Sequence, residues 1–153
     1  MVQYRLVNRL DARTAAYLAG LLDGEGTVTL TRVHRNENRR LVVCIANNDL
    51  ALLKYVQVAV GAGRITRKRT YSDCHSPSFN YQITSRQALE LLRQLLAHLR
   101  TYRRARAALA LDCYLRLTPR NGRYTTEAVA AKEAFAQRLL AIKPNSPAVS
   151  EKQ

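Results

Sequence analysis

The chain has 153 residues, with 25 Lys and Arg against 11 Asp and Glu and a formal net charge of +14 at pH 7. This length allows one domain around one core and excludes two of ordinary size, and the charge favours a polyanionic partner such as nucleic acid over an acidic small molecule. No apolar run approaches the roughly 20 residues that cross a bilayer, and no signal-peptide core follows the first residues, so we expect an intracellular protein with no membrane partner.

The first predicted helix spans residues 11 to 23 and is apolar nearly all round. Asp11 or Thr14 is a suitable N-cap. A helix with so little polar surface must be buried on more than one side, and small residues on it let a second helix approach closely. The sequence therefore predicts a tight helix pair, in which the small contact residues are Ala16, Ala19 and Gly20.

The rest of the chain alternates between β-rich runs and helical patterns. The predicted strands lie at 27–33, 40–47, 64–70 and 79–84, with connecting turns at 34–38 and 72–77. The predicted helices lie at 49–60, 85–98, 102–117 and 125–141, with caps at Asn48-Asp49 and Ser85 and a loop at 118–122. This order predicts an α+β fold with a four-stranded antiparallel sheet backed by helices on one face. We assign residues 1–143 to this single domain and expect the tail, 144–153, to be flexible.

One face of the predicted sheet is polar. Val28 and Leu30 alternate with threonines along the first strand, which is typical of a strand with one buried face. The same alternation in the other three predicted strands places cations, hydroxyls and amides on this face, and such groups bind phosphates and base edges. The residues predicted to bind DNA are Thr27, Thr29, Thr31, Arg40, Arg64, Thr66, Lys68, Asn80 and Gln82. A solvated charged face is the alternative, but the total charge favours nucleic acid.

An acidic turn, Asp23-Gly24-Glu25-Gly26, lies where the first helix is predicted to end. A helix C-terminus carries partial negative charge, so two carboxylates there are unfavourable by a few tenths to about 1 kcal/mol each unless a cation compensates. A divalent metal would compensate. Gly24 is expected to take the left-handed cap conformation. An ordinary glycine cap with two solvent-exposed acids is the alternative.

The nine residues 18–26, LAGLLDGEG, resemble the signature of the LAGLIDADG homing-endonuclease family. The resemblance covers roughly residues 11 to 115, because the following elements have that family's αββαββα order. It implies two strand pairs seated in the DNA major groove and a motif helix that forms the interface between two such folds. Since one copy of the motif is present, it also implies a homodimer that cuts a near-palindromic site.

The resemblance further implies a metal site at the end of the motif. Its last acidic residue, here Glu25, binds the catalytic ion, and Gly24 would lend its carbonyl oxygen. Mg²⁺ is the expected ion, with Mn²⁺ as another candidate, because hard cations prefer oxygen ligands. The family also places a water-holding polar residue near the end of the second strand, and Asn47 has that position, with Asn48 beside it. Asp23 is expected to shape the turn or support the interface.

Two positions depart from the family pattern. Basic residues often complete the site in single-motif members, and Ala51 and Tyr102 stand at those positions. A neutral phenol cannot replace the charge of a lysine. Arg100 and Arg103 flank Tyr102, and Arg103 is our candidate for the missing catalytic cation. The alternative for these arginines is a solvated helix start that contacts phosphates.

The leading functional hypothesis is metal-dependent double-strand cleavage of DNA, a phosphodiester hydrolysis by a homing endonuclease. One alternative is an RNA maturase that assists the splicing of its host intron, since members of the family do so on the same scaffold, and intron RNA would then be a partner. Another is a DNA-binding protein without nuclease activity, which Ala51 and Tyr102 motivate. Intact Glu25 favours the nuclease.

Overall fold

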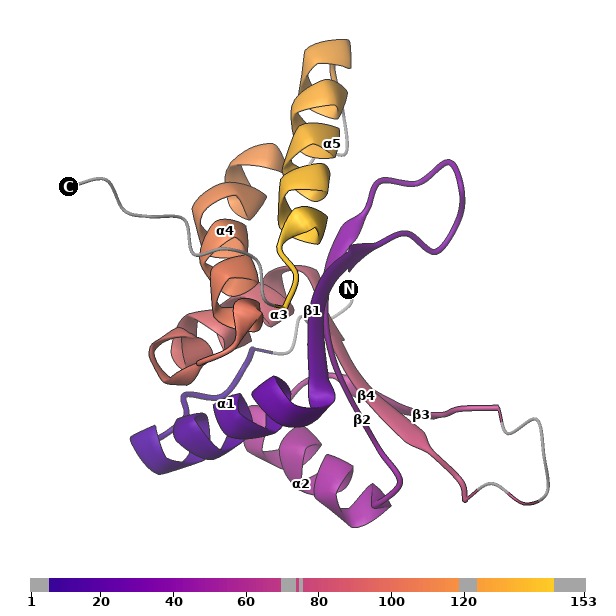
Figure 1. Cartoon of the computed structure of the whole chain (residues 1–153), viewed down its shortest axis with the longest axis vertical. Coiled ribbons are helices and arrows are strands. Elements are labelled where there is room, and N and C mark those ends of the chain that lie inside the picture. The colour runs from indigo at the N-terminus through magenta and orange to yellow at the C-terminus, as the bar shows by residue number, and fades with distance from the viewer. Residues whose placement is uncertain (1–5, 70–73, 75, 119–123, 145–153) are drawn as a thin grey trace.

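A computed structural model of the chain describes residues 6–69, 74, 76–118 and 124–144. In chain order the elements are α1 (Ala12–Glu25), β1 (Gly26–Thr31), β2 (Arg40–Asn47), α2 (Leu50–Val60), β3 (Arg64–Arg67), β4 (Phe79–Thr84), α3 (Ser85–Leu95), the short 3₁₀ helix η1 (Leu96–His98), α4 (Tyr102–Leu117) and α5 (Thr126–Ala141). The predicted α+β class and the αββαββα order with further C-terminal helices are confirmed (Figure 1).

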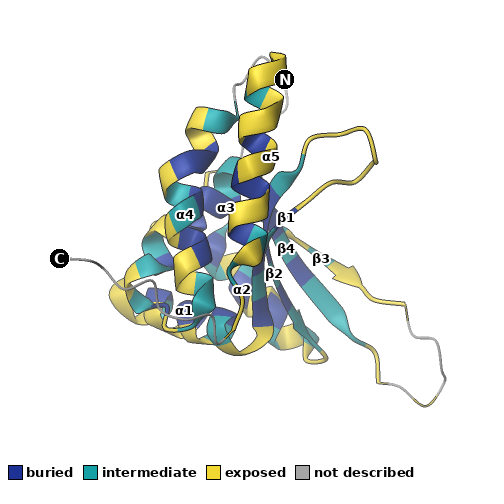
Figure 2. Cartoon of the chain, turned by 45° about the horizontal axis from the view of Figure 1, so that its top comes forward, coloured by how far each residue is buried: buried dark blue, intermediate teal, exposed yellow. Residues whose placement is uncertain are grey.

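The four strands form one antiparallel sheet in the order β1-β2-β4-β3. Alternate strand residues, among them Val28, Val43 and Ile83, are fully buried, and each such side chain contributes about 1.5–3 kcal/mol. Helices α1, α2 and α3 pack on this apolar face, whereas α4 and α5 pack beside β1 (Figures 1 and 2). The core therefore lies between sheet and helices, and none of the described helices covers the opposite face.

The motif helix α1 ends at Glu25, two residues beyond the end that the sequence predicts, residue 23. Asp11 is its N-cap and accepts a hydrogen bond from the Thr14 N–H at 2.7 Å, which holds the pKa of that carboxyl below its usual value. The helix continues through Gly24 and Glu25. The expected left-handed cap at Gly24 is wrong, because among the described glycines positive φ occurs at Gly61 and Gly63.

Helix ends elsewhere follow ordinary capping rules, with one exception. Asp49 caps α2 by accepting from the N–H groups of Ala51 and Leu52, at 3.1 and 3.4 Å, and Gly61 ends that helix at φ 77°. The predicted Ser85 cap of α3 is wrong. Strand β4 runs directly into α3, so Thr84 is the N-cap without a side-chain capping bond, and Ser85 takes φ 56°.

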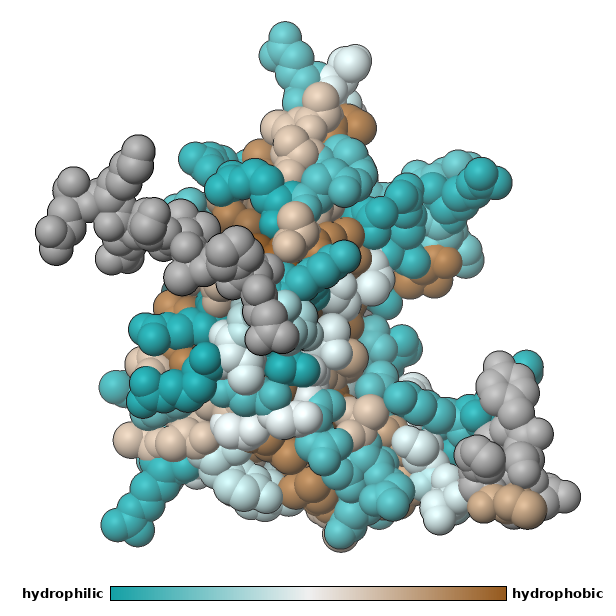
Figure 3. Space-filling view, in the orientation of Figure 1, coloured by the Kyte–Doolittle hydropathy of each residue, from teal (hydrophilic) through white to brown (hydrophobic). Residues whose placement is uncertain are grey.

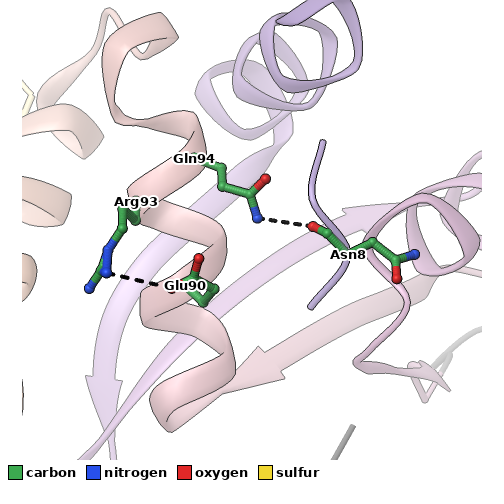
Figure 4. Close-up of polar contacts among 4 residues, drawn as sticks. All are labelled: Asn8, Glu90, Arg93 and Gln94. Carbon is green, nitrogen blue, oxygen red and sulfur yellow. Dashed lines mark hydrogen bonds and ion pairs between the residues drawn. The ribbon is translucent and has the colours of Figure 1, made fainter. Parts of the chain in front are cut away.

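The segment before α1 ties two helices together. The Asn8 N–H donates to the Val60 carbonyl at the end of α2, at 2.8 Å. On α3, the Gln94 side chain donates to the Asn8 carbonyl at 3.0 Å (Figure 4). The same side chain accepts a hydrogen bond from the Leu10 N–H at 2.7 Å. Arg93 faces Glu90 on the same helix at 3.7 Å. The hydrogen bonds of Asn8 and Leu10 hold the start of the motif helix against α2 and α3.

The remaining differences from the predicted boundaries are small. Strand β1 ends at Thr31 rather than residue 33, and β3 ends at Arg67. Thr70, half of the 72–77 turn (residues 72, 73 and 75), the 118–122 loop beyond Thr118, and the tail from residue 145 lie outside the described residues. Among the helices that the structure describes, none has the length and apolar character needed to cross a membrane.

Candidate nucleic-acid interface and active site

The strand register places eight of the nine predicted DNA-binding residues on the open face of the sheet, because directly paired residues of antiparallel strands point to the same side. One row crosses all four strands: Arg64, Gln82, Cys44 and Thr27. The neighbouring rows hold Thr29, Val42 and Thr84; Thr31 and Arg40; and Thr66, Asn80 and Ala46. Lys68 continues this pattern, since its N–H donates to the Ser78 carbonyl at 2.8 Å.

This open face is hydrophilic and hollowed between the β1–β2 hairpin and the far end of β3 and β4 (Figure 3). Arg64, Thr66 and Lys68 are exposed on it. A smaller hollow of about 290 Å³ is lined by Arg40, Arg64 and Gln82, among others, and the Arg40 Nε is buried without a hydrogen-bond partner. The face thus offers cations and amide groups to a ligand.

An apolar strip along β2 also belongs to this face, and the sequence reasoning missed it. Val42, Cys44 and Ala46 share the face with Thr27 and Gln82 through the register. Burial raises the pKa of the Cys44 thiol. The alternation of β2 beginning at Arg40 carried the signal, but Arg40 is the one residue of this strand that the sequence prediction names as DNA-binding. Such side chains suit contact with a thymine methyl group.

Glu25 and Asn47 lie at the same end of the sheet. The register pairs Gly26 with Ile45, so the residue before β1 and the last residues of β2 are neighbours at that end. Glu25 is exposed, and Asn47 is half-buried. The Asn47 side-chain oxygen accepts the Asp49 N–H at 2.7 Å, which fixes the amide and leaves its NH₂ group as a donor.

Asp23 fastens the end of the motif helix to the start of α4. Its carboxylate accepts the backbone N–H groups of Arg100 at 2.8 Å and Thr101 at 3.2 Å, together with the Thr101 hydroxyl. A carboxylate bound by several donors is held in one orientation. Asp23 therefore positions the turn, as expected. The carboxylate that is exposed to solvent is that of Glu25.

Arg103 brings a cation to the turn that follows Glu25. Its Nε donates to the Gly26 carbonyl at 2.6 Å and its Nη1 to the Thr101 hydroxyl at 3.3 Å. The guanidinium also lies 4.8 Å from the centre of the Tyr102 ring. Within the described residues no carboxylate lies within 4 Å of it. Tyr102 therefore supports a neighbouring cation instead of supplying one.

Arg106 is a second cation next to this turn, and it is 8% exposed. Its Nη1 donates to the Val28 carbonyl and its Nε to the Ile142 carbonyl, both at 2.8 Å. Burial lowers the pKa of this guanidinium. Ile142 follows the C-terminus of α5, where helix carbonyls carry partial negative charge. The arginine thereby joins β1 to α5 without a carboxylate partner among the described residues.

Three arginines bind successive alternate carbonyls of the edge strand β1. Arg103 binds Gly26, Arg106 binds Val28, and the Arg39 Nη1 donates to Leu30 at 3.4 Å. Unpaired carbonyls along a sheet edge would otherwise be open to pairing with another strand. These three carbonyls of the β1 edge are therefore bound within the chain.

The motif helix has an exposed stripe of small residues, formed by Ala16, Gly20 and Gly24. A Cβ atom added at either glycine would meet nothing within 4 Å. The contact role predicted for Ala19 needs correction: it is 0% exposed and packs in the core of its own chain. Its side chain therefore cannot meet a second helix, and the stripe contains Gly24 in its place.

The residues at this turn suit a hard divalent cation shared with other ligands. Among the described residues, no group of three or more His, Cys, Asp or Glu could hold a metal. Glu25 supplies one exposed carboxylate and Gly24 one exposed backbone position. Mg²⁺ commonly uses one or two carboxylates and completes its shell with waters and substrate phosphates. The single carboxylate of Glu25 fits that coordination.

Comparisons with known proteins agree with this architecture. The chain matches the sequence model of the LAGLIDADG-like domain over residues 13–95. The homing endonuclease I-CvuI, in complex with its target in the presence of Ca, superimposes with a TM-score of 0.71 and 18% identity, covering 88% of this chain and 85% of that one. The archaeal intron-encoded homing endonuclease I-Vdi141I, complexed with DNA, gives a TM-score of 0.59 at 13% identity, covering 88% and 86%.

The meganuclease I-SmaMI, bound to uncleavable DNA, has the same fold over part of its length. It gives a TM-score of 0.63 at 16% identity, covering 84% of this chain and 45% of that one. At these identities the structural likeness establishes the fold, whereas the family model spans more than half of the 153 residues. The chain belongs to the family of the LAGLIDADG-like domain.

Proposed function

We propose that the chain makes metal-dependent double-strand cuts at a long, near-palindromic DNA site and that it acts as a homodimer. The observation that carries this proposal is the position of Glu25. Its exposed carboxylate lies at the end of the motif helix, between the open polar face and the exposed stripe of Ala16, Gly20 and Gly24. A protein that only gripped DNA would be weakened by a carboxylate near phosphates, because like charges repel.

Glu25 and the Gly24 carbonyl would hold Mg²⁺ or Mn²⁺ in this proposal. When bound, such an ion lowers the pKa of a water and offsets the charge that develops on the leaving 3′ oxygen. The Asn47 NH₂ group would orient the attacking water, because its partner oxygen is fixed by the Asp49 N–H. Support for a divalent ion also comes from I-CvuI, whose complex was obtained with Ca.

Arg103 would supply the positive charge at the scissile phosphate. A guanidinium has five N–H donors, and the described residues use two of them, through Gly26 and Thr101. The remaining donors are free to meet phosphate oxygens. A fixed cation that meets a developing negative charge stabilises the transition state more than the substrate.

A homodimer would place two Glu25 carboxylates near one axis. The small-residue stripe on α1 allows two motif helices to approach closely, and Glu25 is the last residue of that helix. Each chain would then read half of the site with its own sheet. A near-palindromic DNA sequence is the target that such a two-fold arrangement recognises.

The test is cleavage of plasmid DNA that carries the intron-insertion site of the source locus, with and without Mg²⁺. We expect the parent chain to linearise the plasmid only with the metal, and Glu25→Gln to bind the site without cutting it. Glu127→Gln is the matched control, because Glu127 is an exposed carboxylate in the first turn of α5.

Two outcomes would contradict the proposal in different ways. Specific binding by the parent without any metal-dependent cut would mean that Ala51 and Tyr102 mark a DNA-binding protein without nuclease activity. Undiminished cutting by Glu25→Gln would mean that the metal site lies elsewhere in the chain.

A further inference from the structure

A second basic surface lies outside the open face, between the β1–β2 hairpin and α5. A groove of about 200 Å³ separates residues 32–39 of the hairpin from one side of α5. We call it the hairpin–α5 groove. Its charged lining residues are Arg32, Arg35, Glu37, Arg39, Lys132 and Glu133.

The cations of this groove lack carboxylate partners. Four basic side chains line it against two acidic ones, and within the described parts of the chain none of the four forms an ion pair within 4 Å. Glu133 instead accepts a hydrogen bond from Gln137 at 2.9 Å. The groove therefore retains a net positive charge that nothing among the described residues neutralises.

Two of these cations are held inward by neutral groups. Lys132 is 8% exposed, and its Nζ lies 3.1 Å from the Tyr124 hydroxyl and 4.9 Å from the centre of that ring. The Arg39 Nη1 donates to the Leu30 carbonyl, while its Nε is buried without a partner. Removing a charge from water is unfavourable unless an opposite charge or strong hydrogen bonds compensate. An anion in the groove would offset the unfavourable burial of the Lys132 and Arg39 charges.

The position of the groove indicates which anion it meets. Its hairpin continues β1 and β2 beyond the Thr31–Arg40 pair, the outermost row of the open face (Figure 1). DNA that lies along that face and extends past this pair would carry its backbone toward the hairpin. Backbone phosphates attract lysine and arginine without regard to sequence.

We propose that the hairpin–α5 groove binds a backbone phosphate of DNA that flanks the segment read by the sheet. This proposal rests on the proposed DNA-binding function and adds α5 to the contact surface. The groove contributes affinity and register but no base selection, because its charges meet phosphate alone. Lys132 and Arg39 are the fixed cations, and Arg32 and Arg35 are exposed cations at the rim.

The test combines hydroxyl-radical footprinting with binding at several salt concentrations, using a duplex of the insertion site with long flanks. Lys132→Met keeps most of the side-chain volume and removes the charge. Arg35→Gln changes an exposed residue, so it keeps the test decisive if Lys132→Met fails to fold. Lys54→Met on α2 is the matched control, because Lys54 is exposed and α2 packs on the opposite face of the sheet.

Each groove variant is expected to lose protection at the outermost phosphates while central protection persists. Affinity for the duplex should fall about threefold to tenfold. The negative slope of log K against log salt should become less steep by about 1, the amount for one phosphate contact. Unchanged outer protection and slope in both groove variants would overturn the groove assignment alone. No protection anywhere by the parent would overturn the proposed DNA function and the groove assignment with it.

Discussion

Asp23 is the residue that sets the orientation of the motif turn, because three donors from the start of α4 converge on its carboxylate. Asp23→Asn keeps the shape but removes the charge and one acceptor oxygen. We expect the free energy of unfolding to fall by about 1–2 kcal/mol, since hydrogen bonds to charged groups are the stronger ones. Urea denaturation measures this change.

Asp11→Asn is the matched control for that substitution. Asp11 caps the other end of the same helix through the Thr14 N–H, and Asn caps helices as well as Asp does. The urea midpoint of this variant should therefore equal that of the parent. Equal destabilisation by both substitutions would show that Asp23 acts only as another helix-end charge.

Gly26 marks the point where α1 becomes β1, and a side chain there has no room. A Cβ atom would lie 2.9 Å from the Leu22 carbonyl oxygen and 3.0 Å from that of Cys44. We expect Gly26→Ala to destabilise the chain by about 1–3 kcal/mol, because backbone atoms on both sides must shift. Thermal unfolding of this variant beside the parent measures the loss. An unchanged melting temperature would contradict this close packing.

At the scale of elements, the edge of β1 depends on Arg106. Arg106→Met would leave the carbonyls of Val28 and Ile142 without their donor, and we expect a loss of about 2–4 kcal/mol in unfolding free energy. Arg106→Lys should lose less, because an ammonium retains one or two of these bonds. Arg104→Met at an exposed neighbouring position is the control and should change stability by less than about 0.5 kcal/mol.

The elements around Arg106 show which features the sequence predicts and which it does not. Strand β2 and helix α4 were predicted with their observed ends, because their local patterns are periodic and well bounded. The place of Glu25 at the end of the motif also follows from the sequence, whereas its exposure is a finding of the structure. The bonds of Arg106 could not, because they join residues 34 to 78 positions apart in the chain. No local pattern encodes such partners.

Two local predictions failed because tertiary contacts override local preference. Gly24 was expected to end α1 as a left-handed cap, but the bonds from Arg100 and Thr101 to Asp23 anchor that last helical turn. Ala19 was expected to face a second helix, yet it packs in the core. Composition shows that a helix is apolar all round but not which small residues its own sheet and helices cover.

Cys44 makes the open face of the sheet chemically testable. Burial raises its pKa above the ordinary value of 9.0, and the thiolate is the reactive form. Iodoacetamide at pH 8 should therefore label Cys44 more slowly than exposed Cys74, while buried Cys113 stays unlabelled. Bound DNA should slow Cys44 labelling further, as followed by mass spectrometry. Unchanged labelling with DNA bound would place the DNA elsewhere.

The raised pKa of Cys44 also has a consequence for stability. Folding favours the neutral thiol when the folded pKa lies above the unfolded one. The contribution is therefore complete below about pH 9 and is lost as the pH rises through the folded pKa. Cys44→Ala should remove this part of the alkaline loss of stability in denaturant titrations between neutral and alkaline pH.

For the whole molecule, the exposed glycines of α1 are best explained by something outside the chain. Glycine within a helix costs about 1 kcal/mol relative to alanine. Gly20 and Gly24 have open space where a Cβ would stand, so nothing in their own chain requires them. The proposed second motif helix, packed at close range, would require them. This reasoning favours the homodimer independently of the charge at Glu25.

Gly20→Leu tests that conclusion directly. The added side chain fits the isolated chain, so circular dichroism and the melting temperature should match or exceed those of the parent. It would separate two motif helices, however, so light scattering should show a monomer, and cleavage at two strands should be lost together with dimerisation. Ala108→Leu, at an exposed position of α4, is the control and should leave both unchanged. A dimer that persists in Gly20→Leu would mean that two chains associate through another surface, and the placement of paired Glu25 carboxylates would fail with it.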